Sequence, residues 1–223
     1  MKGKWIEKVI IDALWSGKHR VEWTLREDVN VLSGVNGVGK STIIRRLEEG
    51  LAGKTESVHI TYKPKEAQSV CYNVVRGYEP QAITRELLLK VAHVIEEMED
   101  NESNAFLDII DSLLEATGKT IVRNSAEPRF NHEGEILTLE QLSNGERQML
   151  YILFTILSQN KEPGVLLMDE PEISLHIEWQ QRLISLIRQI NPNVQVILTT
   201  HSPAVIMDGW TDCVTDASEI IVN

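Results

Sequence analysis

The feature that most constrains this chain is a glycine-rich loop, LSGVNGVGKST, at residues 32–42. Gly34, Gly39, Lys40 and Ser41 match the pattern G-x-x-x-x-G-K-[ST], which requires a strand before the loop and a helix after it. The preceding DVNVL is apolar and β-branched, and the following STIIRRLEEGLAG has helical apolar spacing that closes on glycines. The segment therefore predicts a strand, a phosphate-binding loop and a helix.

Each residue type in this loop has a physical task. Glycine permits backbone conformations and close approaches that a Cβ forbids, so successive N–H groups can point at phosphate oxygens. We expect Lys40 to contact the β- and γ-phosphates and Ser41 to give a hydroxyl ligand to Mg²⁺. The helix adds its positive dipole end. The residues expected to bind ATP are Gly34, Val35, Asn36, Gly37, Val38, Gly39, Lys40, Ser41 and Thr42.

The composition narrows the class of protein. The 223 residues suffice for one large domain, and 33 acidic against 22 basic residues give a net charge of -11. This charge argues against broad attraction to nucleic acid or an anionic membrane, so DNA contact would be local or indirect. Cys71 and Cys213 lack metal or redox spacing, and we expect both to be buried apolar filler in a reducing compartment. Without an apolar run of roughly 20 residues, we expect a cytoplasmic protein with no membrane contact.

The order of the elements indicates an α/β fold. Apolar alternation predicts strands at 5–14, 20–26, 56–63 and 69–76, then helices from Pro80 to Met98 and at 105–116. The acidic segment 96–103 between these helices is expected to be a solvated turn. A hairpin-like NHEGEILTL precedes a helix at 146–159, the strand GVLLMD, a helix at 177–190 and the strand VQVILTT. This alternation predicts a mainly parallel central sheet covered by helices.

Two further motifs carry polar groups to defined places. VLLMDEPE, residues 165–172, ends a buried strand in two carboxylates at the sheet edge where ligands of α/β folds bind. We expect Asp169 to hold Mg²⁺ and Glu170 to polarise the attacking water as general base. In LEQLSNGERQ, Ser143 and Glu146 form a capping box at the start of an apolar helix, which is either a plain helix cap or a second anion site.

LSNGERQ, followed by VLLMDEPE and then TTHSP, resembles the signature, acidic pair and histidine motif of the ABC-type ATPases, in their order. DEPEISLHIEWQ and TTHSPAVI more narrowly resemble the RecF, SMC and overcoming-lysogenization ATPases and their small AAA-like relatives. The resemblance spans the chain and implies a P-loop NTPase head over residues 1–223. It has a β-rich N-terminal subdomain and a helical subdomain, 80–145, that carries the signature. The SLH at residues 174–176 departs from transporter ATPases, which usually have an aspartate after the leucine.

The resemblance also implies roles for particular residues. Two ATP molecules would lie between two heads, with Ser143 and Gly145 of one head facing the nucleotide of the other. His201 would contact the γ-phosphate and the water. A glutamine should link Mg²⁺ to the helical subdomain, and Gln68 is the leading candidate, with Gln81 as the alternative. An adenine contact is expected near the first turn, from among Lys18, His19 and Arg20 with Trp15 nearby, unless that turn is only solvated.

These motifs predict an ATPase whose ATP binding and hydrolysis drive head-to-head homodimerisation. The resemblance to the RecF-like group implies service in DNA maintenance or defence with an effector protein, a nuclease or similar. The chain itself shows no nuclease constellation. One alternative is a nucleotide-gated interaction module with slow hydrolysis. Another is the ATPase subunit of a membrane transporter. The coiled-coil arm of SMC-type members is not expected, because the segment between Lys40 and Ser143 is too short for it.

Overall fold

The computed structural model describes residues 4–15, 17, 19–65, 67–77, 83–123, 125 and 127–222. Its central sheet has five strands, and every neighbouring pair is parallel, as predicted. The strands are, in order across the sheet, β11 (Val214–Asp216), β3 (Val29–Ser33), β10 (Val194–Thr199), β9 (Gly164–Asp169) and β5 (Tyr72–Arg76). The chain is therefore an α/β protein with a parallel core.

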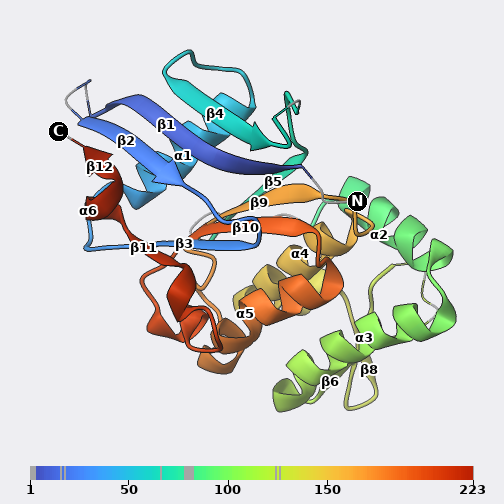
Figure 1. Ribbon diagram of the computed structural model, residues 1–223. Helices are drawn as coiled ribbons and strands as arrows, with labels where there is room; N and C mark the ends of the chain where they lie inside the picture. Colours follow the sequence, from blue (N-terminus) through green and yellow to red (C-terminus); the bar gives the residue numbers. More distant parts are fainter. Residues whose placement is uncertain are drawn as a thin grey trace.

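A second, antiparallel sheet forms the β-rich N-terminal part and lies above the central sheet in Figure 1. Its strands are β12 (Ile221–Val222), β2 (His19–Thr24), β1 (Trp5–Leu14) and β4 (Val58–Lys63). The end of the chain pairs with β2 through β12, which the sequence did not predict. Helix α6 (Ala217–Ile220), just before β12, and strand β11 were not predicted either.

The central strands are buried on both faces, which explains their continuous apolar sequences. In β9, Val165 and Leu167 pack with the antiparallel sheet and with α1 (Lys40–Leu51). Leu166 and Met168, which point the opposite way, pack with α4 (Asn144–Leu157) and α5 (Ile177–Ile190). Two apolar clusters therefore hold the central sheet between two layers, which fixes the loops at its edges.

Between β5 and α4 lie two helices and a small sheet, at the right of Figure 1. The helices are α2 (Arg85–Glu97) and α3 (Asp100–Leu114); the sheet consists of β6 (Lys119–Ile121), β7 (Phe130–His132) and β8 (Glu135–Leu137). β7 and β8 form the predicted hairpin, whereas β6 was not predicted. Pro80, where the first helix was expected to begin, lies outside the described residues.

The predicted solvated turn at 96–103 is wrong for most of its length. Only Met98 and Glu99 separate α2 from α3, and the acidic residues Asp100 and Glu102 lie in the first turn of α3. Carboxylates at this end of a helix are favourable because they complement its dipole. The second helix therefore starts at Asp100 rather than near 105, and α4 likewise starts earlier than predicted, at Asn144.

Of the two cysteines, Cys213 is buried as predicted but Cys71 is exposed. Cys71 comes just before β5, which is the last strand of the central sheet, so it is not enclosed as a residue of an inner strand would be. Among the described residues, no helix combines the length and the apolar character needed to cross a membrane.

A buried amide joins the two sheets. Gln195, 1% exposed on β10, accepts a hydrogen bond from the Ile6 N–H at 2.9 Å and donates to the Ile6 carbonyl at 2.9 Å. It also donates to the Arg26 carbonyl at 2.7 Å. One side chain thus pairs three main-chain groups at the junction between β1, the chain entering β3, and β10.

We expect Gln195→Leu to lower the free energy of unfolding by about 2–4 kcal/mol, because it leaves three main-chain polar groups without partners in a dry position. Urea denaturation measures this. Leu198→Met, a volume-conserving change on the same strand, is the control and should cost at most about 1.5 kcal/mol. Equal losses in the two variants would show that the junction does not depend on the amide.

Candidate functional site

The register of the central sheet brings separate motifs to one edge. Thr199 at the end of β10 lies opposite Leu32 of β3 on one side and opposite Asp169 of β9 on the other. Because the strands are parallel, the segments that leave them at their carboxyl ends emerge together. These segments are the phosphate loop, the acidic pair and the TTHSP motif.

The phosphate loop has the backbone shape that its glycines predict. Gly34, Gly37 and Gly39 have φ values of 141°, 81° and 100°, which a residue with a Cβ rarely adopts. Lys40 is 4% exposed, and its Nζ donates to the Gly34 carbonyl at 2.9 Å and the Val35 carbonyl at 3.3 Å. The lysine ammonium is therefore held within its own loop.

Electrostatics at the start of α1 favour an anion. Burial lowers the pKa of Lys40, and the neighbouring carboxylates of Glu170 and Asp169 oppose that shift. The first turn of α1 has no acidic side chain, so nothing in that turn neutralises the positive end of the helix dipole.

Asp169 lies at the centre of an oxygen cluster. The Ser41 hydroxyl donates to Asp169 Oδ1 at 3.0 Å, and the Thr199 hydroxyl donates to the same oxygen. Asp169 is 1% exposed. Hydroxyl and carboxylate oxygens side by side are the donor set that Mg²⁺ takes beside a triphosphate, so Ser41 and Asp169 fit such an ion.

The expected base and the expected histidine are in contact. His201 Nε2 lies 3.3 Å from Glu170 Oε1, and both side chains are partly exposed. Glu170 has a φ of 49°, a left-handed conformation that is uncommon outside glycine. The main-chain N–H of Glu170 is hydrogen-bonded to Thr199, at 3.2 Å from its carbonyl and 3.1 Å from its hydroxyl. The end of β10 thus fixes the backbone of Glu170, from which the carboxylate reaches His201.

Gly77, which the sequence analysis missed, lies under this turn. A Cβ on Gly77 would be 1.8 Å from the Glu170 carbonyl oxygen, and its N–H donates to the Asp169 carbonyl at 2.9 Å. Only glycine fits there. A glycine just after a predicted strand was the available signal.

Glu172 and Thr200 were missed as well. Glu172 is 8% exposed, and its Oε1 accepts from the Thr200 hydroxyl at 2.6 Å and from the His201 N–H at 2.9 Å. A carboxylate that closely follows a buried apolar strand needs partners if it is enclosed, which is the signal that could have identified Glu172.

The signature segment forms the predicted capping box. Ser143 accepts from the Glu146 N–H while Glu146 accepts from the Ser143 N–H at 2.7 Å. A Cβ on Gly145 would be 2.4 Å from the Ser174 carbonyl oxygen, so the start of α4 touches the loop after the acidic pair. Ser143 and Gly145 are thus placed beside that loop.

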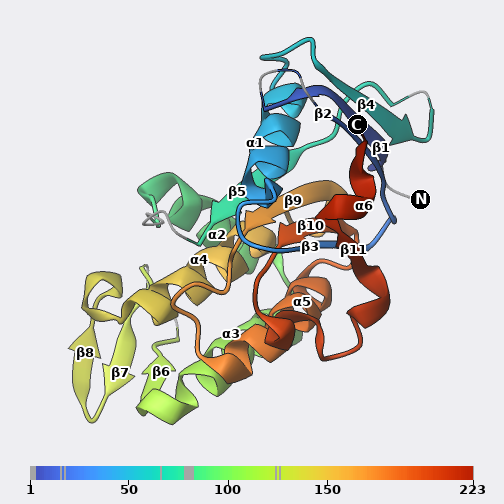
Figure 2. The ribbon, with the colours of Figure 1, turned by 90° about the vertical axis from the view of Figure 1, so that its left-hand side faces the viewer.

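The signature is nevertheless remote from the phosphate loop of the same chain. In Figure 2 the β7–β8 hairpin, which leads into α4, lies at the lower left, whereas α1 begins near the centre. Elements that are apart in one view are apart in space, so the hairpin before the signature helix and the start of α1 lie apart in one chain.

The assignment of Gln68 to the metal is wrong. In the parallel pairing of β5 with β9, Tyr72 lies opposite Val165 and Arg76 opposite Asp169. Gln68 precedes Tyr72, is exposed, and so lies toward the amino ends of the strands, at the opposite edge from Asp169. The alternative, Gln81, follows β5 in the sequence but lies outside the described residues.

Two of the residues expected near adenine lie together. A Cβ on Gly39 would be 2.5 Å from the Trp15 ring, and that ring meets the His19 ring edge-on with centroids 5.4 Å apart. Arg20 instead pairs with Glu22 at 3.2 Å on the surface of β2. Lys18 lies outside the described residues.

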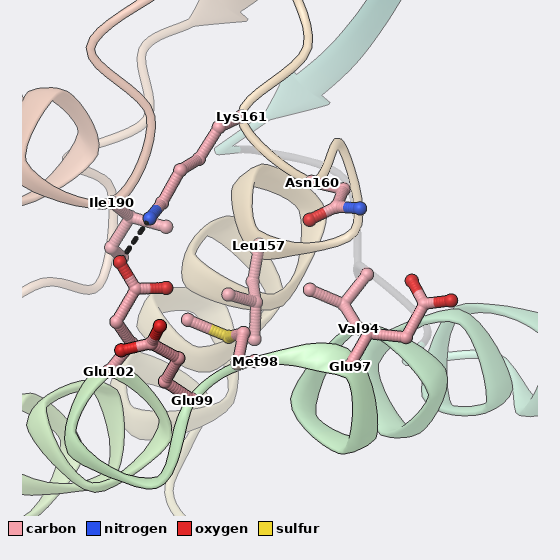
Figure 3. Close-up of a pocket in the computed structure, with 9 residues that line it drawn as sticks. All are labelled: Val94, Glu97, Met98, Glu99, Glu102, Leu157, Asn160, Lys161 and Ile190. Atoms are coloured by element: carbon pink, nitrogen blue, oxygen red, sulfur yellow. Dashed lines mark hydrogen bonds and ion pairs between the residues drawn. The ribbon is translucent and has the colours of Figure 1, made fainter.

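A separate cavity of about 360 Å³ lies at the other edge of the sheet. Leu157 ends α4 and Ile190 ends α5, and both helices lead to the amino ends of central strands. Figure 3 shows Lys161 reaching across this cavity to Glu102, with the two charged atoms 2.7 Å apart. The cavity therefore does not belong to the edge that holds Lys40 and Asp169.

Comparison with known proteins agrees with this geometry. The family model described as "AAA domain, putative AbiEii toxin, Type IV TA system" matches residues 77–208. The "Retron Vc95 probable ATPase" of Vibrio cholerae is 30% identical over 55% of this chain and 24% of its own length. The "Septu protein PtuA" of Bacillus thuringiensis is 34% identical over 33% of this chain and 22% of its own. This chain thus spans about a quarter or less of these relatives.

Among solved structures, the SMC head bound to the C-terminal winged-helix domain of ScpA has a TM-score of 0.64 at 15% identity. The match covers 92% of this chain and 91% of the other, so the fold is that of an SMC head. Since the AAA-domain family model matches more than half of the sequence, the chain belongs to that family.

The ion pair between Glu146 and Lys119, next to the signature, makes the stability of the fold depend on pH. Glu146 is 1% exposed, and burial alone would raise its pKa. Hydrogen bonds from Lys119, from the Ser143 N–H and from Thr117 outweigh burial and lower the pKa to about 2 from 4.5. Because the folded value is the lower one, this stabilisation is present above about pH 4.5 and is lost as pH falls toward 2.

We expect Glu146→Gln to lower the free energy of unfolding by about 3 kcal/mol at pH 7, and the difference from wild type to shrink as pH approaches 2. Urea denaturation at several pH values measures this. Glu56→Gln, at an exposed carboxyl, is the control and should leave the pH profile unchanged. A loss that stays constant down to the lowest pH would contradict the charge-based explanation.

Proposed function

We propose that this chain binds ATP with Mg²⁺ at the edge formed by the phosphate loop and Asp169, and that hydrolysis there controls closure of two copies. The observation that carries the proposal is the convergence of Lys40, the Ser41–Asp169 contact and the Glu170–His201 contact on one sheet edge. The relatives named as retron ATPases support ATP as the nucleotide.

In this proposal each side chain has a task. Lys40 neutralises the β- and γ-phosphates, and Ser41 and Asp169 hold Mg²⁺, which offsets charge on the phosphates. Glu170 accepts a proton from the attacking water, which it orients together with His201. Trp15 and His19 offer an aromatic surface for the adenine base beside the phosphate loop.

The site of one chain lacks a signature, which supports closure by a second copy. In this proposal Ser143 and Gly145 act on the nucleotide of another head, which is supported by the separation of the hairpin before them from the start of α1. Apolar side chains flank the same edge: Val35 is 75% exposed, Ile173 36% and Ile177 51%. A second head that closes over the nucleotide would cover them, which favours closure.

The names of the relatives suggest which process the ATP cycle of this chain serves. Their names belong to retron and Septu systems, and the family description names a toxin and a TA system. We propose that this head serves such a defence system, or genome maintenance, through a separate effector. With a net charge of -11, the chain is a poor DNA-binding surface by itself, so DNA contact would be local or made by the effector.

Glu170→Gln should trap the closed dimer. The amide keeps the size of the side chain but cannot take up a proton, so turnover should fall by roughly 10²- to 10⁴-fold while ATP binding persists. Light scattering after gel filtration with ATP and Mg²⁺ measures the dimer. Glu178→Gln, an exposed carboxylate on α5, is the matched control. A Glu170→Gln protein that turns over at the wild-type rate, or stays monomeric at micromolar concentration, would refute the assignment.

Ser143→Arg should block ATP-driven dimerisation and turnover but spare ATP binding by the monomer, because the bulky cation would occupy the other head's γ-phosphate position. Binding of a fluorescent ATP analogue and light scattering separate the two effects. Ser143→Ala is the matched control, since it loses the same helix cap, worth about 1 kcal/mol, without adding bulk. Loss of ATP binding by the Ser143→Arg monomer would mean that the serine serves its own nucleotide.

A further inference from the structure

One buried carboxylate at this edge has no task in the proposed mechanism. Glu172 is 8% exposed, and its Oε1 receives two hydrogen bonds, from the Thr200 hydroxyl at 2.6 Å and the His201 N–H at 2.9 Å. Its Oε2 is buried and has no partner among the described residues. A buried carboxylate with one oxygen unsatisfied costs free energy, so the hydrogen bonds to the other oxygen, Oε1, must offset that cost.

Oε1 of Glu172 holds the main chain around His201. The Thr200 hydroxyl also accepts from the Ser202 N–H at 3.0 Å, so the turn around His201 closes on a side chain that Glu172 fixes. Hydrogen bonds to a charged acceptor are stronger than neutral ones, and burial strengthens them further. Glu172 is therefore the main anchor of the His201 backbone.

A second side chain anchors the next residue. Gln180 on α5 accepts from the Ser202 hydroxyl at 2.6 Å and donates to the Leu175 carbonyl at 2.9 Å and the Glu172 carbonyl at 3.4 Å. One helix thus ties the histidine turn to the loop after the acidic pair. The two loops are held as one unit, with Glu170 on one and His201 on the other.

The ring of His201 is held much more lightly than its main chain. Among the described residues its ion-pair partner is Glu170, whose Oε1 lies 3.3 Å away, and the side chain is 37% exposed. Where the ring points therefore depends on where the backbone holds its Cα. A displacement of about 1 Å at a reacting group can reduce a rate roughly a hundredfold.

We propose that Glu172 is a positioning residue for hydrolysis: it fixes the His201 backbone so that the imidazole stays against Glu170 and the attacking water. This inference rests on the proposed function, in which Glu170 and His201 act on that water. Glu172 itself touches neither nucleotide nor water; it acts through His201.

The test compares Glu172→Ala and Glu172→Gln, each alone and in a His201→Ala background, with turnover, the KM for ATP and thermal unfolding measured for all. Glu172→Ala should lower kcat roughly ten- to a hundredfold, as expected for losing a charge-assisted hydrogen bond, and leave KM within about twofold. Glu172→Gln should recover most of this loss, because an amide oxygen can still accept from the His201 N–H. In the His201→Ala background, Glu172→Ala should change kcat by no more than about twofold.

A loss of the same factor in both backgrounds, or a loss that Glu172→Gln does not recover, would overturn the inference. If Glu172→Ala does not fold, Thr200→Val replaces it, since valine keeps the shape but removes one of the two hydrogen bonds to Oε1. Its smaller loss must also vanish in the His201→Ala background. Lys40→Ala distinguishes failure of the proposed function from failure of this inference. Wild-type turnover in that variant would refute the proposed function. If turnover is abolished, the Glu172 comparison decides the inference.

Discussion

The site depends on the parallel pairing of β10 with both β3 and β9. Thr199 lies between Leu32 and Asp169, and its hydroxyl bonds to Asp169. Each of the three strands ends at the same level, so a loop that binds phosphate, a carboxylate that suits Mg²⁺ and a histidine come together although they are far apart in the chain. Every other feature of the edge, including the tight fit of Gly77 under Glu170, presupposes this register.

The two layers that cover the central sheet keep that register fixed. One apolar cluster joins the sheet to α1 and the antiparallel sheet, and the other joins it to α4 and α5. Gln195 adds hydrogen bonds from β10 to the main chain of Ile6 and Arg26. Such directional bonds fix the relative position of the two sheets more strictly than apolar packing alone. A rigid platform of this kind allows loops with strained residues, such as Glu170 with its φ of 49°, to keep one conformation.

Local patterns predicted much of this arrangement. The phosphate loop around Lys40, the capping box of Ser143 and the strand that ends at Asp169 are written in contiguous residues, so spacing alone indicates them. Gln68 failed because its place depends on which end of β5 lies beside Asp169, and that is decided by strand direction in the folded sheet. The same limit explains Glu172 and Gly77, whose importance lies in contacts with residues distant in sequence.

The contact between Gly145 and the Ser174 carbonyl has a consequence for how the two nucleotide sites of a closed pair would communicate. In one chain, the signature segment rests directly on the loop that leads back to Glu170. Under the proposed function, a shift of this segment would be passed to the loop that follows Glu170. In the proposed closed pair, each head would thus sense the state of its neighbour's nucleotide where Gly145 packs against Ser174.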